Sequence, residues 1–263
     1  MNSSSSTLFL LCASLLFFVA LASEKLPEFS SSNTEKWGSM HPNYAACSKG
    51  KRQSPININT NDVVANKTMK PLSRKYHIYN ATLCTDGYDT EVAFNGRGEL
   101  IIDGRTYKLK QMHWHTPSEH RLNGVQYPAE LHQVHATDDG NRAVVAILFE
   151  YGKPDPVLTM LKPQLNELAK EPCQGGLERQ VAIPWFGSSF LKKRPRKYYR
   201  YPGSLTTPPC DENVIWSVLT KVESITKDQI EALKAPLCEA NKIKNARPTQ
   251  PLNGRKVQKY DGK

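Results

Sequence analysis

The sequence predicts a β-rich α+β fold, in which one large sheet is accompanied by peripheral helices. Three observations support this class. Short runs rich in β-branched and aromatic residues recur along the chain, prolines are frequent at 18 in 263 residues, and helical spacing is found in two segments. The same texture continues from Trp37 to about Val257 without a linker-like gap, so a single domain is expected over residues 37–257.

The expected strands are short runs bounded by Gly, Asp, Asn or Pro. The run RAVVAILFE, which starts at Arg142, does not alternate apolar and polar residues, as is typical of a central strand buried on both faces. In order along the chain, the runs cover residues 90–95, 99–104, 107–115, 129–137, 142–152 and 213–222.

Two segments, 155–171 and 226–237, have apolar residues at the spacing of an amphipathic helix. In the second segment Thr226 is a suitable N-cap and an acidic residue follows in the first turn, which favours the start of a helix there.

The first 22 residues differ from the rest of the chain. They contain no charged side chain, and an apolar stretch runs from Leu8 to Leu21. This stretch is too short to span a bilayer comfortably, and it ends in the small-x-small pattern Ala20-Leu21-Ala22. We interpret residues 1–22 as a cleaved signal peptide of a secreted protein, with an uncleaved anchor as the alternative. Residues 23–36 are predicted to form a flexible leader, and residues 258–263 a C-terminal tail.

A protein that follows the secretory route can be glycosylated and can form disulfides. The sequons at Asn66 and Asn80 are candidate glycosylation sites. One of the six cysteines, Cys12, is removed with the signal peptide, so five remain. Five cysteines cannot all pair with one another, and at least one thiol is therefore free or paired between chains. The remaining cysteines are Cys47, Cys84, Cys173, Cys210 and Cys238.

The chain is basic, with a formal net charge of +10, and the densest basic run is residues 192–197. Such a run attracts polyanions, acidic cell-wall polymers or membrane surfaces, or it forms a solvated loop without a partner. The sequence contains no nucleic-acid-binding motif and no later apolar segment that crosses a membrane, so neither nucleic-acid binding nor stable membrane insertion is expected.

The histidines of the run QMHWHTPSEH suggest a metal site. Because side chains alternate along a strand, His113 and His115 lie on one face while Trp114 faces the other. His132 joins them if the strand 129–137 is a neighbour, and three neutral imidazoles with one open position are the ligand set of a catalytic zinc. Gln111 and Glu130 each precede a histidine by two residues, and are therefore candidate acceptors for the second ring nitrogen of His113 and His132.

The spacing alone leaves alternatives open. An isolated H-x-H pair is more often a surface pair than a ligand pair, and the absence of a CxxC motif argues against cysteine ligands. The residues alone therefore indicate an open tri-histidine site in a secreted sheet protein, without identifying a reaction.

Several ordered motifs resemble the α-class carbonic anhydrases, especially their secreted plant members. The resemblance covers about Trp37 to Val257 and implies a single-domain, mostly antiparallel, ten-stranded twisted sheet. It also implies secretion to the apoplast, or delivery to a plastid through the secretory route. The motifs are KRQSPINI (51–58), QMHWHTPSEH (111–120), AELHQVH (129–135), YPGSLTTPPC (201–210), VIWSV (214–218) and NARPTQPL (245–252).

The resemblance implies Zn²⁺ held by His113, His115 and His132, and reversible hydration of carbon dioxide to bicarbonate by a zinc-bound hydroxide. Thr206 would accept a hydrogen bond from this hydroxide and donate one to Glu119, and its backbone N–H would mark the site of bound anions. Sulfonamide and anion inhibitors are implied as ligands. Thr207 would contact bicarbonate or an inhibitor, and the apolar wall for carbon dioxide would be Val134, Val144, Leu205, Val214 and Trp216.

Further positions match structural roles in the family. Gln111 and Glu130 match the groups that hydrogen-bond the zinc ligands. His120 and Tyr201 match a buried pair, so His120 is not implied as a ligand. Cys47 and Cys210 match the pair that is bridged in many secreted members.

The sequence departs from the family where a histidine usually shuttles the proton to solvent. Tyr88 stands there, and a tyrosine with a pKa near 10 is poorly matched to proton transfer at pH 7. Asp86 and Glu91 replace common asparagines and are candidate proton relays with Tyr88. Ser39 replaces a common tyrosine, and His41 or His77 could serve only if the fold brings them near. We therefore expect intact zinc chemistry with a slow, buffer-dependent proton step.

A second function is a secreted storage, defence or binding protein with weak or no hydratase activity, as in relatives of the dioscorin and nectarin kind. The retained triad, Thr206 and Glu119 favour the enzyme. A third hypothesis is a redox activity through Cys84, Cys173 or Cys238, but these cysteines match no catalytic motif. The sequence does not fix the oligomeric state.

Overall fold

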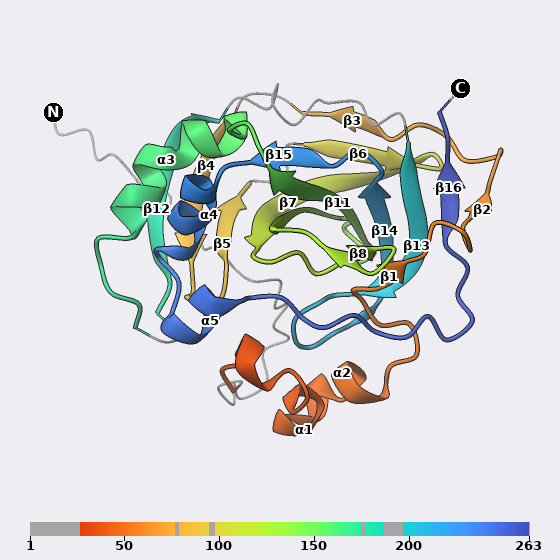
Figure 1. Cartoon of the computed structure of the whole chain (residues 1–263), viewed down its shortest axis with the longest axis horizontal. Coiled ribbons are helices and arrows are strands. Elements are labelled where there is room, and N and C mark those ends of the chain that lie inside the picture. The colour runs from red at the N-terminus through yellow and green to blue at the C-terminus, as the bar shows by residue number, and fades with distance from the viewer. Residues whose placement is uncertain (1–26, 77–78, 95–97, 175–176, 187–196, 263) are drawn as a thin grey trace, which may run out of the picture.

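The computed structural model describes residues 27–76, 79–94, 98–174, 177–186 and 197–262, and its centre is a large twisted sheet (Figure 1). Within these residues the sheet has 13 strands. Ten of them lie on one path, in the order β12 (Arg179–Phe186), β4 (Tyr79–Thr85), β5 (Thr90–Ala93), β7 (Arg105–His115), β10 (Ala129–Ala136), β11 (Arg142–Tyr151), β14 (Glu212–Leu219), β13 (Tyr198–Ser204), β16 (Gln258–Tyr260) and β2 (Val64–Ala65).

Three strands attach beside this path. β15 (Glu223–Ile225) pairs with β11, β6 (Glu99–Ile102) pairs with β7, and β3 (Ser73–Lys75) pairs with β6. A separate small sheet contains β1 (Asn57–Ile58), β8 (Arg121–Leu122) and β9 (Val125–Gln126).

The β-rich fold class and the large sheet are confirmed, but the sheet is mixed. Its parallel pairs are β11 with β14, β11 with β15, and β16 with β2. The two ladders at its centre, β7 with β10 and β10 with β11, are antiparallel. β11 is central, as its sequence predicted, because the strand lies between β10 and β14 and most of its side chains are buried.

Three of the helices lie together at one end of the sheet. α3 (Pro156–Leu168) packs against β12 and α4 (Lys227–Lys234), and α5 (Glu239–Ile243) follows α4 (Figure 1). The side chain of Asp155 caps α3 by accepting a hydrogen bond from Leu158 N, and Thr226 caps α4 within a capping box closed by Gln229. Both helices agree with the predicted segments, and they bury apolar side chains in the same core cluster as Trp114.

The N-terminal part forms four short elements beside the sheet: η1 (Ser31–Asn33), α1 (Trp37–Met40), η2 (Pro42–Tyr44) and α2 (Ala46–Lys49). Two residues within the expected leader contact the folded domain. The Phe29 ring lies 5.6 Å from that of Trp37, and Ser31 Oγ donates to Asn241 Oδ1 at 3.0 Å. At the other end, β16 joins the sheet within the expected tail. The predicted domain boundaries stay a prediction.

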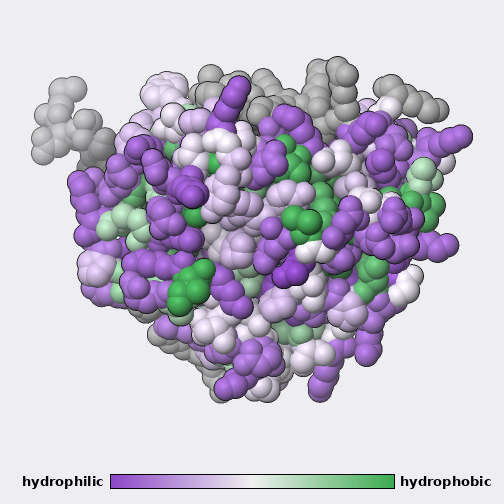
Figure 2. Space-filling view, viewed as in Figure 1, coloured by the Kyte–Doolittle hydropathy of each residue, from purple (hydrophilic) through white to green (hydrophobic). Residues whose placement is uncertain are grey.

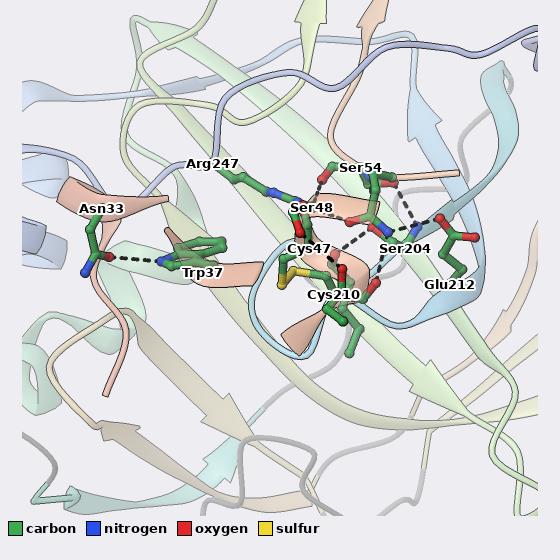
Figure 3. Close-up of a disulfide and its surroundings, with 12 residues drawn as sticks. Asn33, Trp37, Cys47, Ser48, Ser54, Ser204, Cys210, Glu212 and Arg247 are labelled. Atoms are coloured by element: carbon green, nitrogen blue, oxygen red, sulfur yellow. Dashed lines mark hydrogen bonds between the residues drawn. A yellow bond between two sulfur atoms is a disulfide. The ribbon is translucent and has the colours of Figure 1, made fainter. Parts of the chain in front are cut away.

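Two disulfides occur in the described residues, and none of the described cysteines is free. Figure 3 shows the first, Cys47–Cys210, beside Arg247, whose Nη2 donates to Cys47 O at 2.8 Å. The bridge spans 163 residues, so the chain-entropy model assigns it about 5 kcal/mol as an upper-end figure. The second, Cys173–Cys238, is not indicated by any motif in the sequence. The expectation that one thiol is free or paired between chains applies to the chain after removal of the signal peptide, and it stays a prediction.

The surface is predominantly hydrophilic on the face drawn in Figure 2, where apolar residues form small, separated groups. Within the described ranges, no helix combines the length and the apolar character needed to cross a membrane.

The remaining sequence predictions fall partly outside the described residues. Residues 1–22, His77 and residues 192–196 of the basic run lie outside them. Asn80 is exposed on β4, whereas the Asn66 amide donates to Gln258 Oε1 at 3.1 Å. Glycosylation of either residue stays a prediction.

Candidate metal centre

Three histidines converge at the centre of the sheet. His113 and His115 lie two residues apart on β7, and the antiparallel register sets His132 of β10 opposite His113. The three rings have centroid separations of 4.6–5.1 Å. One ligand atom from each ring lies within 4.8 Å of the others. The structure therefore brings together the three residues that alternation placed on one face.

Each imidazole is held by an acceptor at its second nitrogen. His113 Nδ1 donates to Gln111 Oε1 at 2.7 Å, and His132 Nε2 donates to Glu130 Oε1 at 2.9 Å. His115 Nδ1 donates to the carbonyl oxygen of Asn245 at 2.7 Å. These bonds fix the tautomers, so the lone pairs of His113 Nε2, His115 Nε2 and His132 Nδ1 are left to face a common point.

Asn245 is a part of the site that sequence reasoning missed. Its carbonyl holds His115, its Oδ1 accepts from Thr116 N at 2.7 Å, and its Nδ2 donates to Tyr88 O at 3.2 Å and Trp114 O at 3.1 Å. The only signal in the sequence is its place at the start of the motif NARPTQPL, which lies 130 residues beyond His115.

The geometry and protonation of the three rings fit a zinc ion. Tetrahedral zinc with bonds of about 2.0–2.1 Å separates its nitrogen ligands by roughly 3.3 Å, and His113 Nε2 lies 3.2 Å from His132 Nδ1. His115 Nε2 is buried and has no hydrogen-bond partner among the described residues. Burial lowers the pKa of His113 and of His115, although the charge of Glu119 partly opposes the shift at His115. Both imidazoles are therefore neutral at pH 7, as metal ligands must be.

Glu130 connects the metal centre to the core. Its Oε2 accepts from the backbone nitrogens of Glu119 at 2.9 Å and His120 at 2.7 Å, and its Oε1 accepts from His120 Nδ1 at 2.6 Å and from His132. Burial alone would raise its pKa, but attraction by His120 and His132 and these hydrogen bonds outweigh burial and hold the pKa well below the usual value. Glu130 is therefore a buried carboxylate with every lone-pair direction used.

His120 has a structural environment. Its second ring nitrogen lies 2.6 Å from the Tyr201 hydroxyl, which donates to Ser54 Oγ at 2.9 Å. Although His120, Glu130 and His132 form a second cluster of ligand-type atoms, both ring nitrogens of His120 have hydrogen-bond partners. We therefore describe this cluster as a hydrogen-bond network that supports His132.

Glu119 lies next to the three histidines with one oxygen held and one open. Its Oε1 accepts from Arg247 N at 2.8 Å, while its buried Oε2 has no hydrogen-bond partner among the described residues and lies 3.5 Å from His115 Nε2. Thr206 is buried, and it lines a cavity together with His113 and His132. The bond from Thr206 to Glu119 stays a prediction.

A cavity of about 130 Å³ leads to the histidines. His113, His132, Thr206 and Thr207 line it together with the expected apolar residues Val134, Val144, Leu205 and Trp216. Val214, the remaining member of the expected wall, is buried in the core cluster that contains Trp216.

The three residues predicted as candidate proton relays line the same cavity. Tyr88 is 5% exposed, its ring centroid lies 4.9 Å from that of Phe29, and its hydroxyl has no partner among the described residues. Burial, followed by the charge of Glu119, raises the pKa of Tyr88 well above its usual value. Asp86 and Glu91 also line the cavity, and burial raises the pKa of Glu91 well above the usual carboxyl value.

Two further residues named in the sequence analysis lie on the N-terminal elements. Ser39 is exposed and its hydroxyl donates to Lys36 O. The His41 ring lies 5.7 Å from that of Tyr44, a residue that lines the cavity.

Known proteins of one family resemble this chain over nearly all of the residues that the structure describes. The family model of eukaryotic-type carbonic anhydrases matches residues 32–261. Alpha carbonic anhydrase 7 of Arabidopsis thaliana is 40% identical over 228 residues, which cover 86% of this chain and 80% of that relative. Dioscorin DB3S of Dioscorea polystachya is 39% identical over 261 residues, which cover 97% of this chain and 95% of that relative.

Solved structures agree. Dioscorin complexed with ascorbate matches with a TM-score of 0.83 at 37% identity, and the match covers 90% of this chain and 99% of that one. The α-carbonic anhydrase from Thermovibrio ammonificans with the inhibitor sulfanilamide matches with a TM-score of 0.76 at 37% identity, over 88% of this chain and 96% of that one. The chain therefore belongs to the eukaryotic-type carbonic anhydrase family, whose members are zinc enzymes.

Proposed function

We propose that this protein catalyses the zinc-dependent, reversible hydration of carbon dioxide to bicarbonate. The observation that carries the proposal is the convergence of three imidazole nitrogens on one point, with His115 Nε2 buried and unpartnered among the described residues. Zinc bound there would supply activated water at neutral pH, because the ion lowers the pKa of bound water to about 7.

The direct test is stopped-flow hydration of carbon dioxide by protein whose zinc content has been measured. We expect one zinc per chain and activity that a sulfonamide inhibits, since the Thermovibrio relative binds sulfanilamide. Purified protein that takes up no zinc and hydrates no carbon dioxide would contradict the proposal.

The proposed role of Thr206 and Glu119 is to orient the reacting water. Glu119 is fixed from behind by Arg247 N, so its open Oε2 is available to accept a hydrogen bond from Thr206. A hydroxyl that donates to Glu119 must accept from the water, which directs an oxygen lone pair toward carbon dioxide. The apolar side chains Val134, Val144, Leu205 and Trp216 would hold the uncharged substrate nearby.

Replacing Thr206 by valine is therefore expected to lower kcat/KM for hydration by about a hundredfold, because removing one preorganised hydrogen-bonding group from an active site typically costs 10²–10³-fold. Valine keeps the shape of threonine, so zinc content and melting temperature should change little. Zinc analysis and stopped-flow rates check both statements, and a rate within threefold of the parent protein would exclude this role.

We propose that release of the proton limits turnover. Tyr88 is buried with a raised pKa, so it is poorly matched to carrying a proton at pH 7. Burial raises the pKa of Glu91 from its usual low value, so this carboxyl is the remaining candidate relay within the cavity lining. Tyr88→His should raise kcat in dilute buffer by about tenfold, since a positioned acid–base group contributes roughly 10²–10⁴-fold. Imidazole should raise kcat of the parent protein and have a smaller effect on the variant. If neither the substitution nor imidazole changes kcat, proton release does not limit turnover.

A second candidate is a secreted storage, defence or binding protein with little hydratase activity. The observation in its favour is that dioscorin DB3S resembles this chain over 97% of its length, as closely as the Arabidopsis carbonic anhydrase does. Zinc-loaded protein without measurable hydration would favour this function. For either function we propose that the protein is secreted. Mass spectrometry of the protein from its native source should then find glycans at Asn66 and Asn80.

A further inference from the structure

The disulfide between Cys173 and Cys238 lies against the rim of the cavity. We call residues 85–89, which lead from the last residue of β4 to β5, the mouth loop. Its central residue, Gly87, has φ +93°, and a Cβ atom there would lie 2.5 Å from Cys238 Sγ and 2.6 Å from Cys173 Sγ. Only glycine fits such a backbone conformation at this distance, so the mouth loop is seated directly on the two sulfur atoms.

The segment that follows this disulfide holds the mouth loop by hydrogen bonds. The Gly87 carbonyl accepts from Cys238 N and from Asn241 Nδ2, both at 3.0 Å, and Asn245 Nδ2 donates to Tyr88 O. The loop's own bonds, from Gly87 N to Thr85 Oγ1 and from Tyr88 N to the Asp86 carboxylate, shape the turn without attaching it to the rest of the protein. The backbone of the mouth loop is therefore held by residues 238–245, while the Tyr88 ring packs against Phe29.

The two disulfides differ in accessibility. Cys210 is 0% exposed and Cys47 is 8% exposed, whereas Cys173 and Cys238 are both half-buried. Thiol–disulfide exchange requires a thiolate to reach one of the sulfur atoms. A reductant therefore reaches the bridge under the mouth loop more readily than the bridge beside Arg247.

We propose that the Cys173–Cys238 disulfide is a redox-sensitive latch that positions the mouth loop, and that opening it loosens the cavity rim while the three histidines keep their arrangement. In the opening step a dithiol gives up two electrons and two protons. The S–S bond breaks, Cys173 and Cys238 become thiols, and the reductant becomes a cyclic disulfide. The histidines keep their acceptors because Gln111 and Glu130 lie on β7 and β10, and because Asn245 is also anchored to Thr116 N and Trp114 O.

The first test uses the intact protein and does not depend on its activity. Protein is titrated with dithiothreitol without denaturant, alkylated and mapped by mass spectrometry, with hydrogen–deuterium exchange measured in parallel. We expect alkylation of Cys173 and Cys238 before Cys47 and Cys210, and exchange of the amides of residues 87–89 and Cys238 faster by about tenfold. Cys47 and Cys210 serve as the internal control.

Three results would overturn the proposal. The first is alkylation of Cys47 and Cys210 at the same dithiothreitol concentration. The second is unchanged exchange in the mouth loop after Cys173 and Cys238 have been reduced. The third is faster exchange throughout β10 and β11, which would make the disulfide a support of the whole fold.

Variants test the kinetic consequence, which rests on the proposed hydratase function. In Cys173→Ser/Cys238→Ser, the imidazole concentration for half-maximal activation should fall about threefold, because a looser rim admits the buffer more readily, while kcat/KM and zinc content stay within twofold. Gly87→Ala should give the same response with the disulfide intact, because its Cβ displaces the loop from the sulfur atoms.

An unchanged imidazole response in both variants, in active protein, would show that the latch does not control access. If the protein proves inactive, the hydratase proposal fails, and the exchange experiment still decides whether the latch exists.

Discussion

His115→Ala is expected to weaken zinc binding by about a hundredfold or more and to abolish carbon dioxide hydration. Structural zinc sites have apparent binding free energies of about 10–16 kcal/mol shared among their ligands, so one imidazole accounts for roughly 3 kcal/mol. The substitution also removes the hydrogen bond that the Asn245 carbonyl accepts from His115 Nδ1. Zinc affinity, measured by competition with a chromophoric chelator, checks the loss directly.

His41→Ala is the matched control, because His41 is a partly exposed histidine outside the triad. It should retain one zinc per chain. Should His115→Ala bind zinc as tightly as the parent protein, the proposed ligand set is wrong, whatever the activity of the variant.

Glu130→Gln is expected to destabilise the folded protein by about 3–5 kcal/mol, the range typical of removing one partner from a buried charge network. Glutamine has an amide nitrogen in place of one carboxylate oxygen, and a nitrogen of this kind donates but does not accept. Depending on its orientation, the amide loses the hydrogen bonds from the backbone nitrogens of Glu119 and His120 or those from the two imidazoles. Zinc affinity should fall by 10–100-fold as well, because His132 loses the acceptor that fixes its tautomer. Denaturant unfolding of the zinc-free protein measures the stability term separately.

Glu150→Gln is the control for this substitution, because Glu150 is exposed on β11 and its loss should change stability by less than about 0.5 kcal/mol. The pH dependence gives a second readout. The pKa of Glu130 is lowered in the folded state, so its contribution to stability is present above the usual carboxyl pKa and is lost as the pH falls toward the lowered value. The difference between Glu130→Gln and the parent protein should therefore shrink in acid, and a constant difference would contradict the ionised state.

Part of the histidine cluster was predictable from local chain geometry. Alternation along a strand fixes the shared face of His113 and His115, and it aligns Gln111 and Glu130 with the histidines that they hold. The pairing of β7 with β10, which brings in His132, is a long-range contact, and the family resemblance supplied it.

The rest of the site depends on contacts that no local pattern records. Asn245 acts on His115 through its backbone carbonyl, and every residue except proline offers the same donor and acceptor groups there. Cys173 and Cys238 lie 65 residues apart, and their pairing depends on how α5 follows α4 in space. Strands β4, β12 and β13 were also not predicted. β13 contains Pro202 and Gly203, which weaken the strand signal.

The dependence of His115 on Asn245 has a consequence for biosynthesis. The strands that carry the three ligands are complete by residue 136, but the acceptor for His115 belongs to a segment made more than a hundred residues later. A nascent chain can therefore pair β7 with β10 while one imidazole remains free to rotate. The complete histidine cluster, with an acceptor at each ring, therefore requires nearly the whole chain to have been synthesised.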